Sequence, residues 1–512
     1  MDASLARRVA ALAGKEPASS VRVERGFSPA ERWVIQFTDG TSAFAKLATT
    51  EVTAQWLRAE HAFYTKLKAD FMPALLGWND DGKRPLLLLE DLAAAHWPPP
   101  WDGDKIERFL AGLDRLSHTR PVPPGLADLE TDRARYAGWL RVERDPKPFL
   151  SLGLCSAEWL ENALPVLLMA QDFAILSGPD LIHGDVRSDN VCFLGDRVVF
   201  VDWNFARRGN AAFDRAALAA SLRLEGGPLP DELLPDEGPL AALVTGFFAA
   251  NAGLPVIVDA PRVRAIQQRQ LRIALPWAAR SAGLPPPDSS WGSEAISKID
   301  ADLAAGRIDE SAWHIAIEEV IGDSFLAEAD PRAQSGKSGD EEEWRWAREL
   351  ALDALPEGSG PFHVLDVGCA NGYLMESFVR WGRERRLAIT PHGLDISPRL
   401  ATLARRRLPA YAAHIAAGNL LDWSPPRRYD LVHTALDYVP PARRRDSIER
   451  LQRDVLAPNG RIVLRGERVR PGDADLPQQV AALGLSVGGV IERKHPKSGE
   501  LRRTVWIGPK KV

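Results

Sequence analysis

Hydrophobic and polar positions change their spacing several times along the chain, and the first change separates a strand-rich region from a helical one. Residues 19–48 hold three short runs in which apolar residues largely alternate with polar ones, SSVRVERGF, RWVIQFT and TSAFAKLA, the last two joined by Asp39-Gly40. This pattern and the Asp-Gly turn predict strands that include a hairpin. A stretch with helical spacing, EVTAQWLRAEHAFYTKLKA, and an apolar run, RPLLLLEDL, follow. We therefore predict an α+β lobe, a small sheet with one helix, over about residues 1–92.

Most of residues 93–290 is predicted to be helical. The helical pattern runs from about Trp101 to Ser177, gives way to two apolar runs between residues 181 and 203, and resumes up to LRIALPWAARSAGL. The segment that follows, LPPPDSS at 284–290, is rich in proline, which disfavours helix continuation. We predict that this segment is a linker and that a first domain ends at residue 290.

After the linker the pattern changes again. Residues 291–350 are polar with helical spacing, and we expect them to form a helical connector. After Pro356, strand-like runs such as HVLDVG, HGLDIS and RRYDLVHTAL alternate with helical ones such as YLMESFVRWGRERR. Such alternation predicts a parallel sheet with helices on both faces, an α/β domain over residues 351–512.

Composition limits the class of protein. The 512 residues are 45% hydrophobic and 26% charged, as in soluble multidomain proteins. The three widely separated cysteines cannot form a disulfide framework or a zinc cluster, which suits a reducing compartment. The N-terminus has no long apolar segment, and no later run reaches the roughly 18 apolar residues of a membrane span. We expect a cytoplasmic protein without a membrane partner.

Charge is unevenly distributed. Residues 351–512 hold 26 Lys and Arg against 17 Asp and Glu, a charge of +9, which leaves −14 for residues 1–350 within the total of −5. A basic half is one sign of nucleic-acid binding. Its Arg clusters at 405–407 and 443–445 have helical surroundings, where a solvated helix face is the more common explanation. We therefore expect no nucleic-acid partner and keep RNA as an alternative.

Candidate chemistry concentrates in LIHGDVRSDNVCFLGDRVVFVDW, residues 181–203. Asp185 follows a strand-like run, Asn190 comes soon after it, and Asp202 ends a second apolar run. Phosphoryl transfer needs such a set, one carboxylate to accept a hydroxyl proton and two oxygen ligands to hold Mg²⁺ against nucleotide phosphates. His183 is expected to orient this loop through hydrogen bonds rather than to carry a proton.

Lys46 and Glu60 fit the same chemistry. Lys46 lies in a predicted strand, where its ammonium group can bind the α- and β-phosphates of ATP. Glu60 lies in the helix that follows, where its carboxylate can hold the lysine in place.

The motif His183-Gly184-Asp185, with Asn190 and Asp202-Trp203, resembles the aminoglycoside phosphotransferase and choline kinase-like family over roughly residues 1–290. The resemblance implies a protein-kinase-like bilobal fold, with Asp185 as the catalytic base and Asn190 and Asp202 as the metal ligands. It also implies that the hinge whose backbone pairs with adenine is Glu90-Asp91-Leu92.

Two features of this half leave alternatives open. Arg187 follows the proposed base by two positions, where a cation can offset charge on the transferring group, or else can form an ion pair with Asp189 or Asp214. The phosphate-covering loop, residues 24–29, has one glycine where protein kinases have three.

A second motif, VLDVGCANG at 364–372, joins a strand-like run to a helix through a glycine-bearing turn. Glycine lets a cofactor approach the backbone where a Cβ would collide. One strand later, Asp395 ends HGLDIS, where a carboxylate can accept both hydroxyls of a ribose.

These features resemble the class I S-adenosylmethionine-dependent methyltransferases over about residues 351–512, which implies a Rossmann-like fold. By position, the cofactor contacts would be Asp366, Gly368, Ala370 and Gly372 at the methionine end, Asp395 at the ribose, and Asn419 and Leu420 at the adenine. Ala370 replaces the family's common middle glycine, so we expect weaker cofactor binding rather than none. The segments LGLSVGGVIER and LRRTVWIG are expected to close the sheet as an antiparallel pair, and residues 334–344 to fold over the cofactor.

His433, Asp437 and Tyr438 follow the fourth predicted strand of this domain, and we expect them to line the acceptor side, with structural roles as the alternative. ALDY at 435–438 is not the Asn/Asp-Pro-Pro-Tyr/Phe sequence of enzymes that methylate amino groups of DNA bases or glutamine. This difference favours a small-molecule acceptor.

The sequence leads to the hypothesis of a bifunctional transferase that phosphorylates a small-molecule hydroxyl with ATP and methylates the same or a related molecule. One alternative is a methyltransferase whose kinase-like domain only binds a ligand. Asp185 or Asp202 packed away from any open cleft would favour it. Another alternative is RNA methylation, which predicts that the two Arg clusters share a face with the cofactor mouth. The sequence fixes neither the acceptors nor the oligomeric state.

Overall fold

The computed structural model describes all residues except 25–28, 102–103, 259, 337–338, 469–474, 496, 498 and 509–512, together with the side chains of 466–468. The chain forms two compact units, Met1–Trp291 and Gly292–Val512. The phosphate-covering loop expected at 24–29 falls largely outside the described residues.

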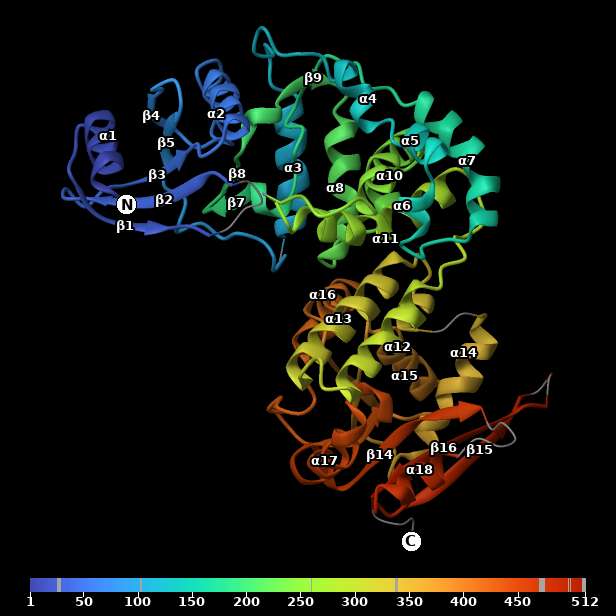
Figure 1. Ribbon diagram of the computed structural model, residues 1–512. Helices are drawn as coiled ribbons and strands as arrows, with labels where there is room; N and C mark the ends of the chain where they lie inside the picture. The colour runs from blue at the N-terminus through green and yellow to red at the C-terminus, as the bar shows by residue number, and fades with distance from the viewer. Residues whose placement is uncertain are drawn as a thin grey trace. The chain divides into compact units, whose positions relative to one another are not determined.

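An antiparallel sheet forms the N-terminal lobe of the first unit. In the described part of the chain it has five strands in the order β1-β2-β3-β5-β4, so β3 (Ser42–Leu47) is the central strand. Helix α1 (Ala3–Ala13) packs Leu5 and Val9 against this sheet, in a cluster with Ile35 and Leu88. Figure 1 shows these blue strands grouped at one end of the unit. Neither α1 nor β4 was predicted, and helix α2 ends at Tyr64, five residues before the predicted end.

Helices form the rest of the first unit, and α5, α6, α7, α10 and α11 lie together at the end away from the sheet (Figure 1). Helix α10 is apolar nearly all round, and most of its residues are buried, as expected for a helix surrounded by others. Two short antiparallel ladders, β6 with β9 and β7 with β8, lie between α7 and α8 along the chain. They carry the loop that holds the candidate catalytic residues.

The bounds of the helices and strands in the first unit are as follows: α1 Ala3–Ala13, β1 Pro17–Arg22, β2 Glu31–Phe37, β3 Ser42–Leu47, α2 Glu51–Tyr64, β4 Leu75–Asn79, β5 Leu86–Glu90, α3 Lys105–Ser117, α4 Arg133–Tyr136, α5 Trp139–Arg144, α6 Lys147–Leu150, α7 Ala157–Asp172, β6 Asp180–Ile182, β7 Val191–Leu194, β8 Arg197–Phe200, β9 Arg207–Gly209, α8 Ala212–Leu224, α9 Pro230–Leu233, α10 Gly238–Ala252 and α11 Val263–Ser281.

A mixed sheet organises the second unit. Its described strands have the order β12-β11-β10-β13-β14-β16-β15, parallel from β12 to β14 and antiparallel for the last two. Successive strand residues face opposite sides, so Val364 packs in one core cluster with Phe378 and Trp381, and Leu365 in another with Ile448. The predicted α/β architecture and its closing antiparallel pair are confirmed.

The bounds in the second unit are as follows: α12 Trp291–Ala304, α13 Glu310–Ala327, α14 Glu341–Arg348, β10 Phe362–Val367, α15 Tyr373–Glu384, β11 Ile389–Asp395, α16 Pro398–Arg407, β12 Ile415–Ala417, β13 Tyr429–Thr434, α17 Arg444–Arg450, β14 Leu456–Arg468, α18 Leu476–Ala482, β15 Gly489–Lys494 and β16 Leu501–Ile507.

The proline-rich segment before Trp291 is bound to the first unit. Trp159 donates its ring N–H to the carbonyl of Pro285 at 3.0 Å, and the Ser156 amide donates to the Asp288 carboxylate at 2.7 Å. Cys155, Cys192 and Cys369 are all buried thiols. Within the described residues, every helix is too short or too polar to cross a membrane.

Candidate active sites

Lys46 is the centre of a buried ion-pair cluster in the first unit. Strand β3 presents it toward helix α2, where its Nζ donates to both carboxylate oxygens of Glu60 at 2.9 and 3.1 Å. The same ammonium also contacts Asp202, which follows strand β8. Burial acts to lower the pKa of Lys46, but Asp202 and Glu60 outweigh it and raise the pKa above its ordinary value. The lysine is therefore held as a cation.

The loop between β6 and β7 carries the candidate base. Asn190 donates its side-chain amide to the carbonyl of Asp185 at 2.8 Å and to its carboxylate at 3.1 Å. The backbone carbonyl of Asn190 also accepts a hydrogen bond from the Val201 amide at 3.0 Å, which ties this loop to the strand before Asp202. Asp202 itself has a left-handed backbone, with φ of 65°. The side chains of Asp185 and Asp202 are 31% and 33% exposed, so neither is packed away.

Buried groups beneath this loop fix its backbone. Asp214, on helix α8, accepts hydrogen bonds from the amides of His183 and Gly184 at 2.7 and 2.9 Å. His183 is fully buried; its Nε2 bonds the Val201 carbonyl at 2.9 Å, and its Nδ1 accepts from the Asp185 amide at 3.3 Å. Burial raises the pKa of Asp214 to about 7 and lowers that of His183. His183 thus has the orienting role that we predicted.

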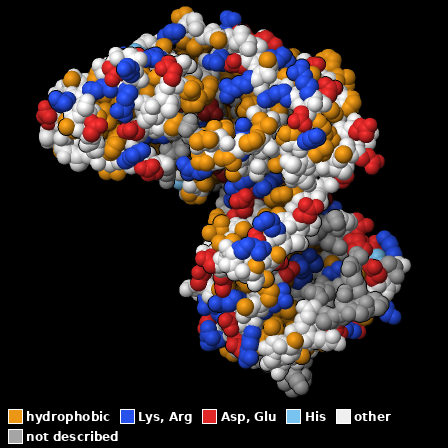
Figure 2. Space-filling model, viewed as in Figure 1, with side chains coloured by type: hydrophobic (Ala, Val, Ile, Leu, Met, Phe, Trp, Pro, Cys, Tyr) orange, Lys and Arg blue, Asp and Glu red, His pale blue; other side chains and the backbone are white. Residues whose placement is uncertain are grey.

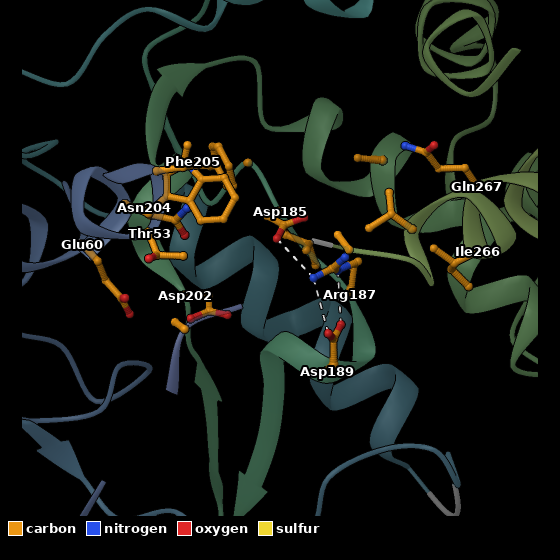
Figure 3. A pocket seen from close by; sticks show the side chains of 18 of the residues that line it. Thr53, Glu60, Asp185, Arg187, Asp189, Asp202, Asn204, Phe205, Ile266 and Gln267 are labelled. Atoms are coloured by element: carbon orange, nitrogen blue, oxygen red, sulfur yellow. Dashed lines mark hydrogen bonds and ion pairs between the residues drawn. The ribbon is translucent and has the colours of Figure 1, made fainter. Parts of the chain in front are cut away.

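Glu225 gives the loop a second anchor. Its carboxylate accepts hydrogen bonds from the Ser188 hydroxyl at 2.5 Å and from the Trp101 ring N–H at 2.6 Å. Arg187 lies beside this anchor, 3.4 Å from Asp185 and 3.2 Å from Asp189 (Figure 3). The ion pair with Asp189 is one of the two we considered, and Asp214 instead binds the backbone.

A cavity of about 600 Å³ opens onto these groups. Its lining includes Lys46, Glu60, Asp185, Arg187 and Asp202. Figure 3 shows the side chains of Glu60, Asp185, Arg187 and Asp202 around the same space. Figure 2 shows hydrophobic side chains gathered around a hollow in this part of the surface. Packing of either aspartate away from any cleft would favour a purely ligand-binding kinase-like domain, and neither Asp185 nor Asp202 is packed in this way.

The expected hinge is not part of this cavity. Neither Glu90 nor Leu92 is among its lining residues. The Glu90 carboxylate instead binds the Arg197 guanidinium at 2.7 and 3.2 Å and accepts from the Ala74 amide at 3.1 Å. Leu92 is buried, and its carbonyl accepts from the Trp97 ring N–H at 3.2 Å. The Glu90 side chain therefore joins the two lobes, and a nucleotide role for this segment stays a prediction.

Asn190 and Asp202 have side-chain oxygens of the kind that Mg²⁺ takes as ligands; Asp202 lines the cavity, whereas Asn190 is buried and is not among the described lining residues. The side-chain nitrogen of Asn190 donates to Asp185, so its side-chain oxygen is the atom that can serve as a metal ligand. Among the described residues there is no cluster of three His, Cys, Asp or Glu that could hold a metal by itself. Mg²⁺ bound through one or two protein oxygens completes its shell with substrate phosphates, and this pair fits that arrangement.

In the second unit, the turn after β10 requires glycine. Gly368 has φ of 73°, and a Cβ there would lie 2.6 Å from the Tyr438 ring. Tyr438 is therefore packed directly over the turn, and burial raises its pKa to about 12. Ala370 has φ of 47°, a left-handed conformation that disfavours a side chain.

Asp395 ends strand β11 and is tied to the same turn. Its carboxylate accepts from the amides of Ala370 at 2.7 Å and Ser397 at 2.8 Å. Burial raises its pKa to about 6. Each carboxylate oxygen keeps a further lone pair, so the group can still accept hydrogen bonds from a ribose.

A cavity of about 180 Å³ brings together six of the residues predicted in this half: Gly368, Asp395, Asn419, Leu420, Asp437 and Tyr438. Asp366 and Gly372 do not line it; a Cβ on Gly372 would meet Leu408 at 2.7 Å, so that glycine serves packing. His433, expected on the acceptor side, is buried, and its Nδ1 lies 2.8 Å from the Asp366 carboxylate, which can accept a hydrogen bond from it. That expectation is corrected: His433 and Asp366 form a pair beneath the cavity.

Two protein-family models match the parts of the chain that carry these two sites. Residues 20–241 match the model of the phosphotransferase enzyme family, and residues 364–460 match a methyltransferase domain model. The chain joins a phosphotransferase-family domain to a methyltransferase domain. It is therefore a transferase enzyme with two domains. No curated protein matches the chain.

Solved structures similar to the phosphotransferase domain include macrolide 2′-phosphotransferase MphH from Brachybacterium faecium, with 14% identity over 62% of this chain and 97% of that one, TM-score 0.33. A choline/ethanolamine kinase family protein from Mesorhizobium loti has 14% identity over 65% and 96%, TM-score 0.33. A SAM-dependent methyltransferase from Aquifex aeolicus has 14% identity over 35% and 98%, TM-score 0.26. Scores this low add nothing on activity.

The methyltransferase domain has cavity residues that the sequence did not indicate. Helix α13 contributes Trp313, Glu318 and Phe325 to the lining, and the segment after it contributes Ser335 and Gly336. Glu318 accepts from the Ser397 hydroxyl at 2.6 Å, which fastens α13 beside Asp395. Ser335 and Gly336, which belong to the segment expected to fold over the cofactor, thus line the cavity, while Lys337 and Ser338 are outside the described residues.

The Arg clusters are not part of the described lining of this cavity. Arg405 donates to the Ile415 carbonyl, Arg407 to Glu376, and Arg445 to Glu449. None of residues 405–407 or 443–445 is among the described lining residues. RNA methylation stays an alternative prediction, because Arg443 lies 3.6 Å from Glu310 on α13, a helix that contributes to the cavity lining.

Proposed function

We propose that the protein phosphorylates a small-molecule hydroxyl with ATP and transfers a methyl group from S-adenosylmethionine to the same or a related molecule. The observation that carries the proposal is the meeting of Lys46, Asp185 and Asp202 at one open cavity. Three charged groups of this kind serve positioning and charge neutralisation, which supply most of the catalysis in phosphoryl transfer.

In the proposed phosphotransfer, Asp185 accepts the proton of the acceptor hydroxyl. The hydroxyl oxygen forms a bond to the γ-phosphorus while the bond from that phosphorus to the β,γ-bridging oxygen breaks, and ADP leaves with that electron pair. Lys46, held by Glu60, neutralises phosphate charge. Asn190 keeps the Asp185 carboxylate oriented toward the cavity.

Asn190 and Asp202 would hold Mg²⁺, which neutralises charge on the phosphates when it is bound. Without nucleotide, the Lys46 ammonium forms an ion pair with a carboxylate oxygen of Asp202, the group that would bind the metal. We infer that nucleotide and metal bind together, since phosphate oxygens give Lys46 a new partner and free Asp202 for the metal.

In the proposed methyl transfer, the domain's residues align the reactants. S-adenosylmethionine supplies an activated methyl group when bound, and a well-placed acceptor atom can react without a protein base. Asp395 would accept the ribose hydroxyls, Asn419 and Leu420 would contact the adenine, and the turn at Gly368 would hold the methionine end. Asp437 and Tyr438 remain the proposed acceptor side.

The decisive experiment is incubation of the protein with a metabolite library, Mg²⁺, ATP and S-adenosylmethionine, followed by mass spectrometry. Added phosphate and added methyl are separated by omitting one donor at a time. A compound that gains phosphate only when ATP and Mg²⁺ are present supports the first activity. Release of ADP without any modified compound, in every library tested, would contradict it.

We also propose a cytoplasmic location, which the three buried thiols support.

A further inference from the structure

The far end of the phosphotransferase cavity differs from the catalytic end. Its wall comes from one face of helix α11, at Val263, Ile266 and Gln267, and from residues of α8 and α10 that include Phe213 and Phe247. These positions recur at the three- and four-residue spacing that places side chains on one face of a helix. The described acidic lining residues of the cavity are all at its catalytic end. A bound molecule would therefore meet a mostly apolar surface here.

Two amide side chains interrupt the apolar wall, and both are oriented by neighbours. The Gln267 carbonyl accepts from Arg264 at 2.8 Å, which leaves its NH₂ group for the cavity. Gln270 donates to the Ser221 hydroxyl at 2.6 Å, which leaves its carbonyl. Figure 3 shows Ile266 and Gln267 facing the space opposite Asp185 and Arg187. The wall thus offers neutral hydrogen bonds rather than counter-charges for ammonium groups.

Arg135 is a basic lining residue of the cavity whose side chain is exposed. Its guanidinium lies 5.0 Å from the centre of the Phe205 ring and 5.5 Å from that of Tyr136, and it lines the cavity. The nearby Asp132 carboxylate binds Arg207 at 2.8 Å instead. Stacking on aromatic rings orients a guanidinium while leaving its N–H edge to bind an anion. The same stacking places a positive charge on the aromatic faces that would otherwise attract a cationic ligand.

We propose that the acceptor of the phosphotransferase domain is a bulky, largely apolar hydroxyl compound that carries an anionic group, and that Arg135 recognises this group. The proposal rests on the proposed phosphotransfer and adds the chemical class of its substrate. Apolar surface fits the wall of α8, α10 and α11. A polycationic acceptor would be placed beside Arg135 without a described carboxylate at that end of the cavity, which is unfavourable by repulsion and desolvation.

A matched pair of dyes tests the assignment without knowledge of the acceptor. The anionic probe is 1-anilinonaphthalene-8-sulfonate, and its neutral counterpart is N-phenyl-1-naphthylamine, which has the same aromatic body. Both are titrated by fluorescence into the full-length protein with saturating Mg²⁺ and a non-hydrolysable ATP analogue, so that the nucleotide position is filled.

Arg135→Ala should weaken binding of the anionic dye about ten-fold, the loss of a single charge-assisted contact, and leave the neutral dye unchanged. Arg135→Lys should restore most of the anionic dye's affinity. Ile266→Ser should weaken both dyes by a similar factor, about five-fold, because it removes apolar wall. The matched control is Phe173→Ser: Phe173 is 69% exposed and lies outside the cavity, so neither dye should respond.

Equal losses for the two dyes in Arg135→Ala, or no loss for the anionic dye, would overturn the proposal. So would complete displacement of the anionic dye by the ATP analogue, which would place it at the nucleotide position. Failure of the proposed phosphotransfer gives a different result: the dyes respond as expected, but no hydroxyl compound receives phosphate.

Discussion

The ammonium group of Lys46 donates to both carboxylate oxygens of Glu60, at 2.9 and 3.1 Å, and contacts Asp202 as well. Lys46 is thus shared between a carboxylate that positions it and a carboxylate that is a proposed metal ligand. The two partners should have separable effects, and substitutions can distinguish them.

Replacement of Glu60 by Gln should raise the KM for MgATP roughly ten- to a hundred-fold, the size expected for loss of a charged hydrogen bond. Without Glu60, Asp202 is the carboxylate left to hold Lys46, and it becomes a poorer metal ligand. Steady-state kinetics over a range of Mg²⁺ concentrations measures this, and high Mg²⁺ should recover part of the loss. Glu51→Gln, an exposed change on the same helix, is the control. An unchanged KM would show that Glu60 does not position the lysine.

Asp185→Asn and Asp202→Ala should fail in different ways. The first should keep nucleotide binding and lose about 10²–10⁴ in rate, the usual contribution of a general base. The second should abolish Mg²⁺-dependent ATP turnover. Calorimetry with the ATP analogue and a turnover assay, with the exposed Asp196→Asn as control, measure both. Full activity in the two variants would remove the phosphotransfer assignment.

Asp214 should make stability depend on pH. Burial raises its pKa in the folded state to about 7, from an ordinary value of 3.8. The folded state therefore binds more protons than the unfolded state between those values, so this contribution is complete below about pH 4 and is lost as the pH rises through 7. Asp214→Asn does not titrate. The difference in Tm between wild type and variant should shift in favour of the variant from pH 5 to pH 8, and a pH-independent difference would argue against the raised pKa.

Asp395→Ala should weaken S-adenosylmethionine binding about ten- to a hundred-fold, because charge-assisted hydrogen bonds contribute roughly 1.5–3 kcal/mol. ATP binding should be unchanged. In the wild type, affinity for S-adenosylmethionine should also fall as the pH drops through about 6, where the Asp395 carboxylate becomes protonated. Calorimetry with each ligand tests this, with the exposed Asp446→Ala as control. A parallel loss of ATP affinity would mean that the cofactor pocket has been misassigned.

The two units should fold separately. Fragments 1–291 and 292–512 follow the division of the contacts, and each keeps its own core. Circular dichroism and thermal unfolding of each fragment should give a cooperative transition. The first fragment should include the segment that ends at Trp291, since Pro285 and Asp288 of this segment are hydrogen-bonded to Trp159 and Ser156 in the first unit. Two insoluble fragments beside a soluble full-length chain would indicate a shared core.

The site residues that the sequence predicted lie close together along the chain or on neighbouring elements, so the sequence pattern alone brings them together. Lys46 and Glu60 lie on one strand and the next helix, so their approach follows from the order of two short elements. Asp185, Asn190 and Asp202 lie within one strand-loop-strand segment. Gly368 and Asp395 end neighbouring parallel strands, whose carboxyl ends meet at one edge of a sheet.

The parts that were missed have no local signal. Asp214 lies in an alanine-rich helix 29 positions after Asp185, and only packing reveals that it holds the His183 and Gly184 amides. Helix α13 resembles a polar connector in sequence, yet it brings Glu318 to Ser397. The family resemblance implies a hinge at Glu90, but the contact of its side chain with Arg197 depends on the other lobe and has no local signal.

Each of the two cavities takes its lining residues from one unit alone, the first from residues before 271 and the second from residues after 312. Because one polypeptide carries both, every synthesised copy delivers one site of each kind. The ratio of the two sites in a cell is therefore fixed at one to one, whatever the level of expression. If both modifications fall on one molecule, the balance between singly and doubly modified product is set by the turnover numbers of the sites and by the supply of the two donors, and not by enzyme abundance.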